Sequence, residues 1–152
     1  MASQRDLPEN LKTVLEAEPV DFAFLFGSQA SGRITPMSDL DIAVQFSQSV
    51  KNKFKALLNL YPKIEKLVGL QKHIDIVDVG NASPSLKYNI AREGKLLFCK
   101  NELAFSIFKT RACLDYFDIA PTLNIIHQMT LDQIRQSYEK RHHGQRIIFK
   151  TH

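Results

Sequence analysis

The chain has 152 residues, of which 44% are hydrophobic and 24% charged, and its formal net charge is +4. This composition is typical of a soluble globular domain and excludes a disordered chain, a collagen-like repeat and a disulfide-rich scaffold. No apolar stretch reaches the roughly 18 residues of a membrane span, and residues 1–10 are too polar for a signal peptide. The two cysteines are well separated in the sequence. We therefore expect a reduced, cytoplasmic protein.

The first fifty residues predict one helix followed by two strands. Leu11, Val14 and Leu15 have the spacing of a short amphipathic helix that begins after Pro8. Residues 20–26 are apolar on both faces, which indicates an inner strand covered on both sides. A helical turn and a loop are expected over 29–38, and a second strand over 40–46.

The next fifty residues continue the alternation of helices and strands. Residues 51–70 predict two helical pieces separated by Pro62, and a third strand is expected over 73–79. A helix over 84–93 that stops at Gly94, and a last strand over 95–99, complete an α/β (α+β) layered domain. Residues 51–100 carry ten basic and four acidic side chains. Their lysines alternate with apolar residues as on a solvated helix face, so we expect no direct nucleic-acid binding.

The remaining residues predict helix up to about residue 141, interrupted by Pro121, and then a basic tail. We therefore expect a first domain over 1–100 and a helical extension over 101–152 that packs on or beside it. This extension is too short for an independent substrate domain. Its apolar side chains would form either a layer that covers the core or an exposed patch for a partner; they are Phe105, Phe108, Phe117, Ile125 and Met129.

The most informative motif is Gly27-Ser28, followed after ten residues by Asp39-Leu40-Asp41. A Gly-Ser pair at the end of a buried strand offers backbone N–H groups and a hydroxyl to a phosphate. Asp39 and Asp41 lie two residues apart at the start of a strand, so they share a face with Cα atoms roughly 7 Å apart. Two such carboxylates can share divalent cations such as Mg²⁺.

A third carboxylate on a neighbouring strand would complete a two-metal centre. Residues 74–79 offer Asp75 and Asp78, which lie on opposite faces of the expected strand. Strand periodicity does not choose between them. Either one could instead cap a helix or form a salt bridge, since an unpaired buried carboxylate is destabilising.

The motif, and the surrounding stretch 26–44, resemble the signature of the polymerase-beta-type nucleotidyltransferases, in particular the minimal nucleotidyltransferases of prokaryotes. The resemblance covers about residues 10–100 and implies a mixed β-sheet palm flanked by helices. It also implies transfer of AMP from ATP to a tyrosine of a HEPN-domain ribonuclease toxin, which silences that toxin, so the chain would be an antitoxin and an enzyme.

The same resemblance implies roles for individual residues. Gly27 and Ser28 would hold the ATP phosphates, and Asp39, Asp41 and Asp75 would bind two Mg²⁺ ions and be the catalytic residues. Asp75 matches the family pattern better than Asp78. Gln29 and Ser31 stand where the family often has arginine, so the nearest basic side chain is that of Arg33; Arg33 and Ser38 are further candidates for binding the nucleotide.

Two other readings remain open at this point. The chain could be a binding module that neutralises a partner by occlusion without catalysis. It could also transfer a nucleotide to a small molecule or to RNA. Histidines such as His73 are scattered along the chain and predict no zinc site, and the oligomer could consist of identical or of different chains.

Overall fold

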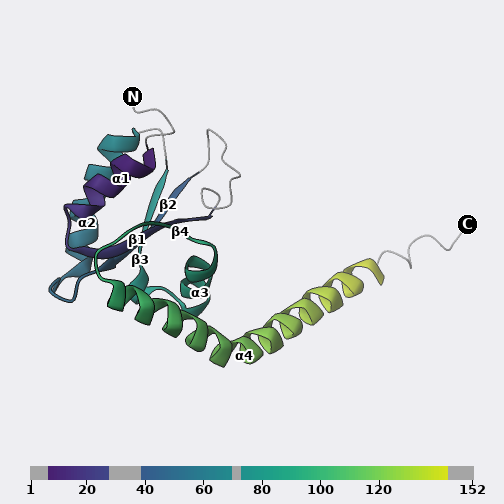
Figure 1. Ribbon diagram of the computed structural model, residues 1–152. Coiled ribbons are helices and arrows are strands. Elements are labelled where there is room, and N and C mark those ends of the chain that lie inside the picture. Colours follow the sequence, from purple (N-terminus) through teal and green to yellow (C-terminus); the bar gives the residue numbers. More distant parts are fainter. Residues whose placement is uncertain (1–6, 28–38, 70–72, 144–152) are drawn as a thin grey trace, which may run out of the picture. The chain divides into compact units, whose positions relative to one another are not determined.

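The computed structural model describes residues 7–27, 39–69 and 73–143 (Figure 1). The turn expected over 29–38 lies outside the described residues, and so does the end of the basic tail. Ser28, Arg33 and Ser38, three of the predicted nucleotide contacts, also lie outside them.

Four strands form one mixed sheet in the order β3-β2-β1-β4. Their bounds are Val20–Phe26 (β1), Leu40–Phe46 (β2), Ile74–Asp78 (β3) and Lys95–Cys99 (β4). β1 pairs antiparallel with both β2 and β4, whereas β2 and β3 run parallel. The predicted α/β class with a mixed sheet flanked by helices is therefore confirmed.

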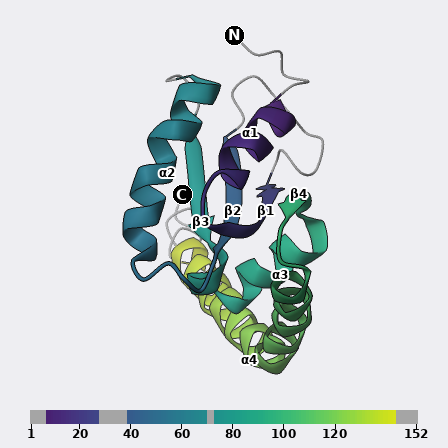
Figure 2. The ribbon, with the colours of Figure 1, turned by 60° about the vertical axis from the view of Figure 1, so that its left-hand side comes forward.

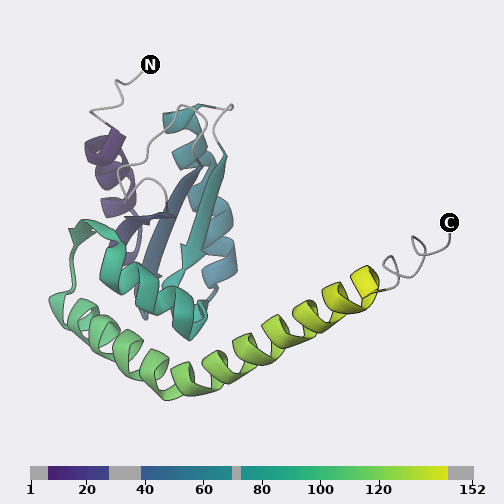
Figure 3. The ribbon, with the colours of Figure 1, turned by 90° about the vertical axis from the view of Figure 1, so that its right-hand side faces the viewer.

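The helices cover both faces of the sheet (Figures 2 and 3). One face carries α1 (Leu7–Glu16) and α2 (Lys53–Val68). The other carries α3 (Pro84–Glu93) and the beginning of α4 (Glu102–His143). A 3₁₀ turn, η2 (Val79–Asn81), connects β3 to the segment before α3.

The inner strand β1 contributes to both cores, as its two apolar faces predicted. Ala23 and Leu25 pack toward α1 and α2, while Phe22 and Phe24 pack on the opposite face. There the Phe22 ring lies 5.3 Å, between centroids, from the ring of Phe108 in α4. Because aromatic pairs at this spacing add to the burial of apolar area, the first turns of α4 are held firmly on the sheet.

Both predicted proline interruptions are wrong. α2 runs through Pro62 and α4 runs through Pro121 without a break. A proline removes one helical hydrogen bond and crowds the preceding turn. In α2 that loss falls on an exposed side, while Leu60 and Ile64 on either side of the proline are fully buried and keep the helix on the core. In α2, tertiary packing thus outweighs the local preference of proline.

By its internal contacts the chain divides into two compact units, Met1–Leu114 and Asp115–His152. The first unit contains the expected domain 1–100 together with the first turns of α4. The apolar residues of the C-terminal extension behave in two ways, because Phe105 and Phe108 join the core whereas Phe117, Ile125 and Met129 are exposed. No helix in the described part of the chain is long and apolar enough to cross a membrane.

Candidate active site

Three aspartates lie near one another where β2 and β3 begin. Asp41 and Asp75 are direct partners in the parallel register of these strands, so their backbones are about one strand spacing, roughly 4.8 Å, apart. The Leu40 N–H donates to the His73 carbonyl oxygen at 2.9 Å and extends the pairing toward Asp39. Register, which is a long-range property, thus assembles residues that are more than thirty positions apart in the sequence.

Gly27 completes this arrangement at the end of β1. Its backbone has φ +67°, a conformation that glycine adopts without strain. A Cβ atom at this position would lie 2.1 Å from Oδ2 of Asp41. The missing side chain therefore leaves the space that the Asp41 carboxylate occupies, and residue 27 must be small for the carboxylate to lie where it does.

The cluster is electrostatically unbalanced. The pKa of Asp41 is raised above its ordinary value of 3.8, first because burial removes water from the carboxylate, and then because the charges of Asp75 and Asp39 repel its ionised form. His73 acts in the opposite direction. A half-buried carboxylate that faces two others is the environment in which a bound cation gains most.

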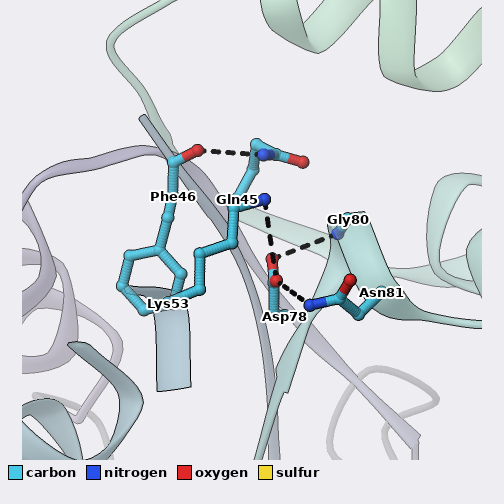
Figure 4. A network of polar contacts seen from close by, with 6 residues as sticks. All are labelled: Gln45, Phe46, Lys53, Asp78, Gly80 and Asn81. Carbon is cyan, nitrogen blue, oxygen red and sulfur yellow. Dashed lines mark hydrogen bonds and ion pairs between the residues drawn. The ribbon is translucent and has the colours of Figure 1, made fainter. Parts of the chain in front are cut away.

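Asp78 does not belong to this cluster. It lies on the other face of β3, next to α2, and is only 5% exposed. Its carboxylate accepts hydrogen bonds from the Gly80 N–H at 3.1 Å and from Nδ2 of Asn81 at 2.7 Å, and Nζ of Lys53 lies 3.7 Å away (Figure 4). It caps η2 and forms a salt bridge, which is the structural role that the sequence had left open for it.

His73 is a neighbour that the sequence did not single out. Its Nδ1 lies 3.9 Å from Oδ1 of Asp39, and both side chains are well exposed. The available signal was its position two residues before Asp75, which places both side chains on one face of a strand. Among the described residues, no three His, Cys, Asp or Glu side chains already lie at metal-binding spacing.

The donor chemistry of the cluster suits a hard cation. Asp39, Asp41 and Asp75 offer only carboxylate oxygens, which is the ligand type that Mg²⁺ takes in proteins, usually together with substrate phosphates and water. The close approach of the Asp41 carboxylate to Gly27 also orients it from one side. These three residues could therefore hold Mg²⁺ beside a nucleotide.

Comparison with known proteins agrees with this geometry. Residues 9–103 match the family model "Polymerase beta, Nucleotidyltransferase". A putative protein adenylyltransferase of Methanocaldococcus jannaschii is 34% identical over 71 residues, which are 47% of this chain and 69% of that protein.

Solved structures share the fold. A chain from the crystal structure of a toxin–antitoxin with AMP-PNP has a TM-score of 0.62 at 23% identity, covering 84% of this chain and 98% of that one. A chain from a complex of the tri-AMPylated Shewanella oneidensis HEPN toxin with MNT antitoxin has a TM-score of 0.59 at 21% identity, covering 88% and 99%. The family match spans well over half of the chain and contains the glycine and all three clustered aspartates, and this chain accordingly belongs to the polymerase beta nucleotidyltransferase family.

Proposed function

We propose that this chain transfers AMP from ATP to a tyrosine hydroxyl of a HEPN-domain toxin and thereby acts as its antitoxin. The observation that carries the proposal is the convergence of Asp39, Asp41 and Asp75 beside Gly27 in a nucleotidyltransferase fold. The relative named a putative protein adenylyltransferase, and the neighbour that contains a tri-AMPylated HEPN toxin, favour a protein as the acceptor.

The residues of the site would have different roles, namely metal binding and phosphate binding. Asp39 and Asp41 would hold Mg²⁺ together with the triphosphate, and Asp75 would complete a site for two ions. Bound Mg²⁺ would neutralise the phosphates and polarise the phosphorus–oxygen bonds. Gly27 and Ser28 would present backbone N–H groups to the phosphates, with Arg33 and Ser38 as additional contacts.

The reaction is a substitution at the α-phosphorus of ATP. The acceptor oxygen forms a new bond to that phosphorus, while the bond to the oxygen bridging to the β-phosphate breaks and pyrophosphate leaves. The hydroxyl proton passes to a carboxylate, for which Asp75 is placed best, because it is exposed and lies on the edge strand of the sheet.

Labelled ATP tests the proposal directly. The chain, Mg²⁺ and the protein encoded by the neighbouring gene are incubated together, and label on a tyrosine of that protein is the expected result. The Asp39→Asn/Asp41→Asn double variant should lose both labelling and neutralisation of the toxin. Neutralisation that survives in this variant would instead support occlusion, and label on RNA or on a small molecule would replace the protein acceptor.

A further inference from the structure

His73 and Asp39 lie side by side, each directly before a strand of the sheet. The Leu40 N–H donates a hydrogen bond to the His73 carbonyl oxygen at 2.9 Å, and this bond continues the parallel register in which Asp41 is paired with Asp75. Side chains two residues apart along a strand share a face. One face therefore carries two neighbouring rows. The outer row holds Asp39 and His73, and the inner row holds Asp41 and Asp75.

The separation of the two side chains in the outer row limits what they can share. Nδ1 of His73 lies 3.9 Å from Oδ1 of Asp39, which is too long for a hydrogen bond. An imidazole nitrogen and a carboxylate oxygen each bind Zn²⁺ at about 2.0–2.2 Å, so one ion can bond to two such atoms that are up to about 4.2 Å apart. The separation in the outer row is within that limit.

A purely structural ion pair accounts poorly for this contact. The side chain of His73 is 76% exposed and that of Asp39 is 60% exposed, and an ion pair so open to water contributes little to stability. The same exposure has a use at a metal site, because water or a substrate phosphate can then occupy the remaining coordination positions.

We propose that His73 and Asp39 together bind a divalent transition-metal ion through Nδ1 and Oδ1, next to the inner row. The two rows then differ in ligand chemistry. Carboxylates alone suit Mg²⁺, whereas a site that includes imidazole favours ions such as Zn²⁺. The scattered histidines predicted no zinc site in the sequence, and only the strand register brings one of them beside a carboxylate. The inference rests on the proposed function, since it adds His73 to the same metal site.

NMR of the histidine side chains tests the proposal with the metal alone. The full-length chain, with isotope-labelled histidine, is titrated with Zn²⁺ at one pH, chosen so that imidazole is neutral. The His73 signals are assigned by their absence in His73→Gln. Zn²⁺ should shift the Nδ1 signal of His73, and Mg²⁺ should not, because Mg²⁺ takes oxygen ligands.

Two aspartate variants separate ligation from a nearby binding event. Asp39→Asn should remove most of the Zn²⁺-dependent shift of His73, because the ion loses its charged ligand. Asp78→Asn, at the other end of β3, is the matched control and should preserve the shift. An unmoved His73 signal in the wild type, or an equal shift in Asp39→Asn, would overturn the proposal.

Calorimetry measures the selectivity between the two ions. His73→Gln should weaken Zn²⁺ binding about tenfold or more, which is at least the loss that an altered outer-shell partner causes. It should change Mg²⁺ binding by less than about twofold. His127→Gln replaces another exposed histidine, on α4, and should bind both ions as the wild type does. Equal losses of Zn²⁺ and Mg²⁺ binding in His73→Gln would show that His73 is not a ligand.

These measurements use neither ATP nor an acceptor protein, so they can fail independently of the proposed function. An absence of AMP transfer to tyrosine would contradict the proposed function and would leave the response of His73 to Zn²⁺ unchanged. Conversely, AMP transfer together with a His73 signal that ignores Zn²⁺ would overturn the metal site of the outer row alone.

Discussion

The two ends of β3 place an aspartate in opposite environments. At the C-terminal end, Asp78 is buried and its negative charge is balanced by two hydrogen bonds and by the ammonium of Lys53. At the other end, Asp75 faces Asp41, whose pKa is raised by burial and by the neighbouring carboxylates. The charge of Asp78 is thus balanced within the protein, whereas the cluster of Asp39, Asp41 and Asp75 lacks enough positive charge to balance it.

This difference separates structure from function within a single strand. A satisfied carboxylate stabilises its surroundings, and removing it leaves donors unpaired. A carboxylate cluster without enough cations destabilises the fold, and it is retained where a ligand supplies the missing charge. Substitutions at one end of β3 should therefore change mainly the activity, and substitutions at the other end mainly the stability.

The largest expected effect is on activity. Asp41→Asn should lower the rate of nucleotidyl transfer by roughly 10³-fold, because the variant loses one charged ligand of the proposed Mg²⁺ site. Asp78→Asn is the matched control at the other end of β3 and should keep most of the activity. Rates come from single-turnover labelling with the toxin, and equal losses in both variants would contradict the contrast.

The next effect is on stability and should show the reverse order. Asp78→Ala should lower the free energy of unfolding by about 2–3 kcal/mol, since Lys53, Gly80 and Asn81 lose their shared acceptor. Urea denaturation monitored by circular dichroism measures the loss. Asp75→Ala, with an exposed side chain, should change stability little; a loss as large as that of Asp78→Ala would mean that Asp75 is structural.

The stabilisation of the protein by its ligand should depend on the aspartates at only one end of β3. Mg²⁺ with a non-hydrolysable ATP analogue at about 100 times its Kd should raise the free energy of unfolding by about 2.7 kcal/mol. The gain should disappear in Asp41→Asn and persist in Asp78→Asn. Thermal melts with and without chelator are sufficient, and an unchanged gain in Asp41→Asn would place the nucleotide elsewhere.

Gly27→Ala tests the contact that orients Asp41. The added Cβ would collide with the carboxylate, and alanine at φ +67° is strained by about 1–2 kcal/mol. We expect a loss of stability of this size together with weaker Mg²⁺-dependent nucleotide binding, measured by calorimetry. Gly69→Ala is the control, because it shares a positive φ but meets no atom within 4 Å; it should lose stability and keep binding.

The smallest effect is on the pH dependence of stability. Because folding raises the pKa of Asp41, the folded state binds this proton more tightly than the unfolded state does. The resulting stabilisation is complete below the ordinary pKa of 3.8 and is lost as the pH rises through the folded-state pKa. Asp41→Asn should therefore be slightly more stable than wild type at pH 7, with the difference shrinking toward acid. A difference that grows toward acid would reverse the sign of the shift.

Local sequence signals were sufficient for most elements of the fold. The two-faced apolar run of β1 predicted an inner strand, and Ser83-Pro84 and Gly94 bracket α3 where caps are expected. The two prolines gave wrong predictions because proline disfavours a helix interior at every position, whereas the support that a helix receives from its neighbours differs from one position to another. Pro62 lies on the exposed side of a helix that Leu60 and Ile64 hold on the core, and no local pattern reports that support.

The sequence by itself determined the kind of chemistry, because a small-residue turn and two aspartates at a fixed spacing follow from residues close together in the chain. The family resemblance already favoured Asp75 over Asp78, but strand periodicity did not choose between them, and only the tertiary structure paired Asp75 with Asp41 and brought His73 beside Asp39. Strand periodicity tells which residues of β3 share a face. The register between β2 and β3 decides which of those residues lies beside Asp41. Register depends on how the whole sheet packs against its helices, and that information is spread over the entire chain.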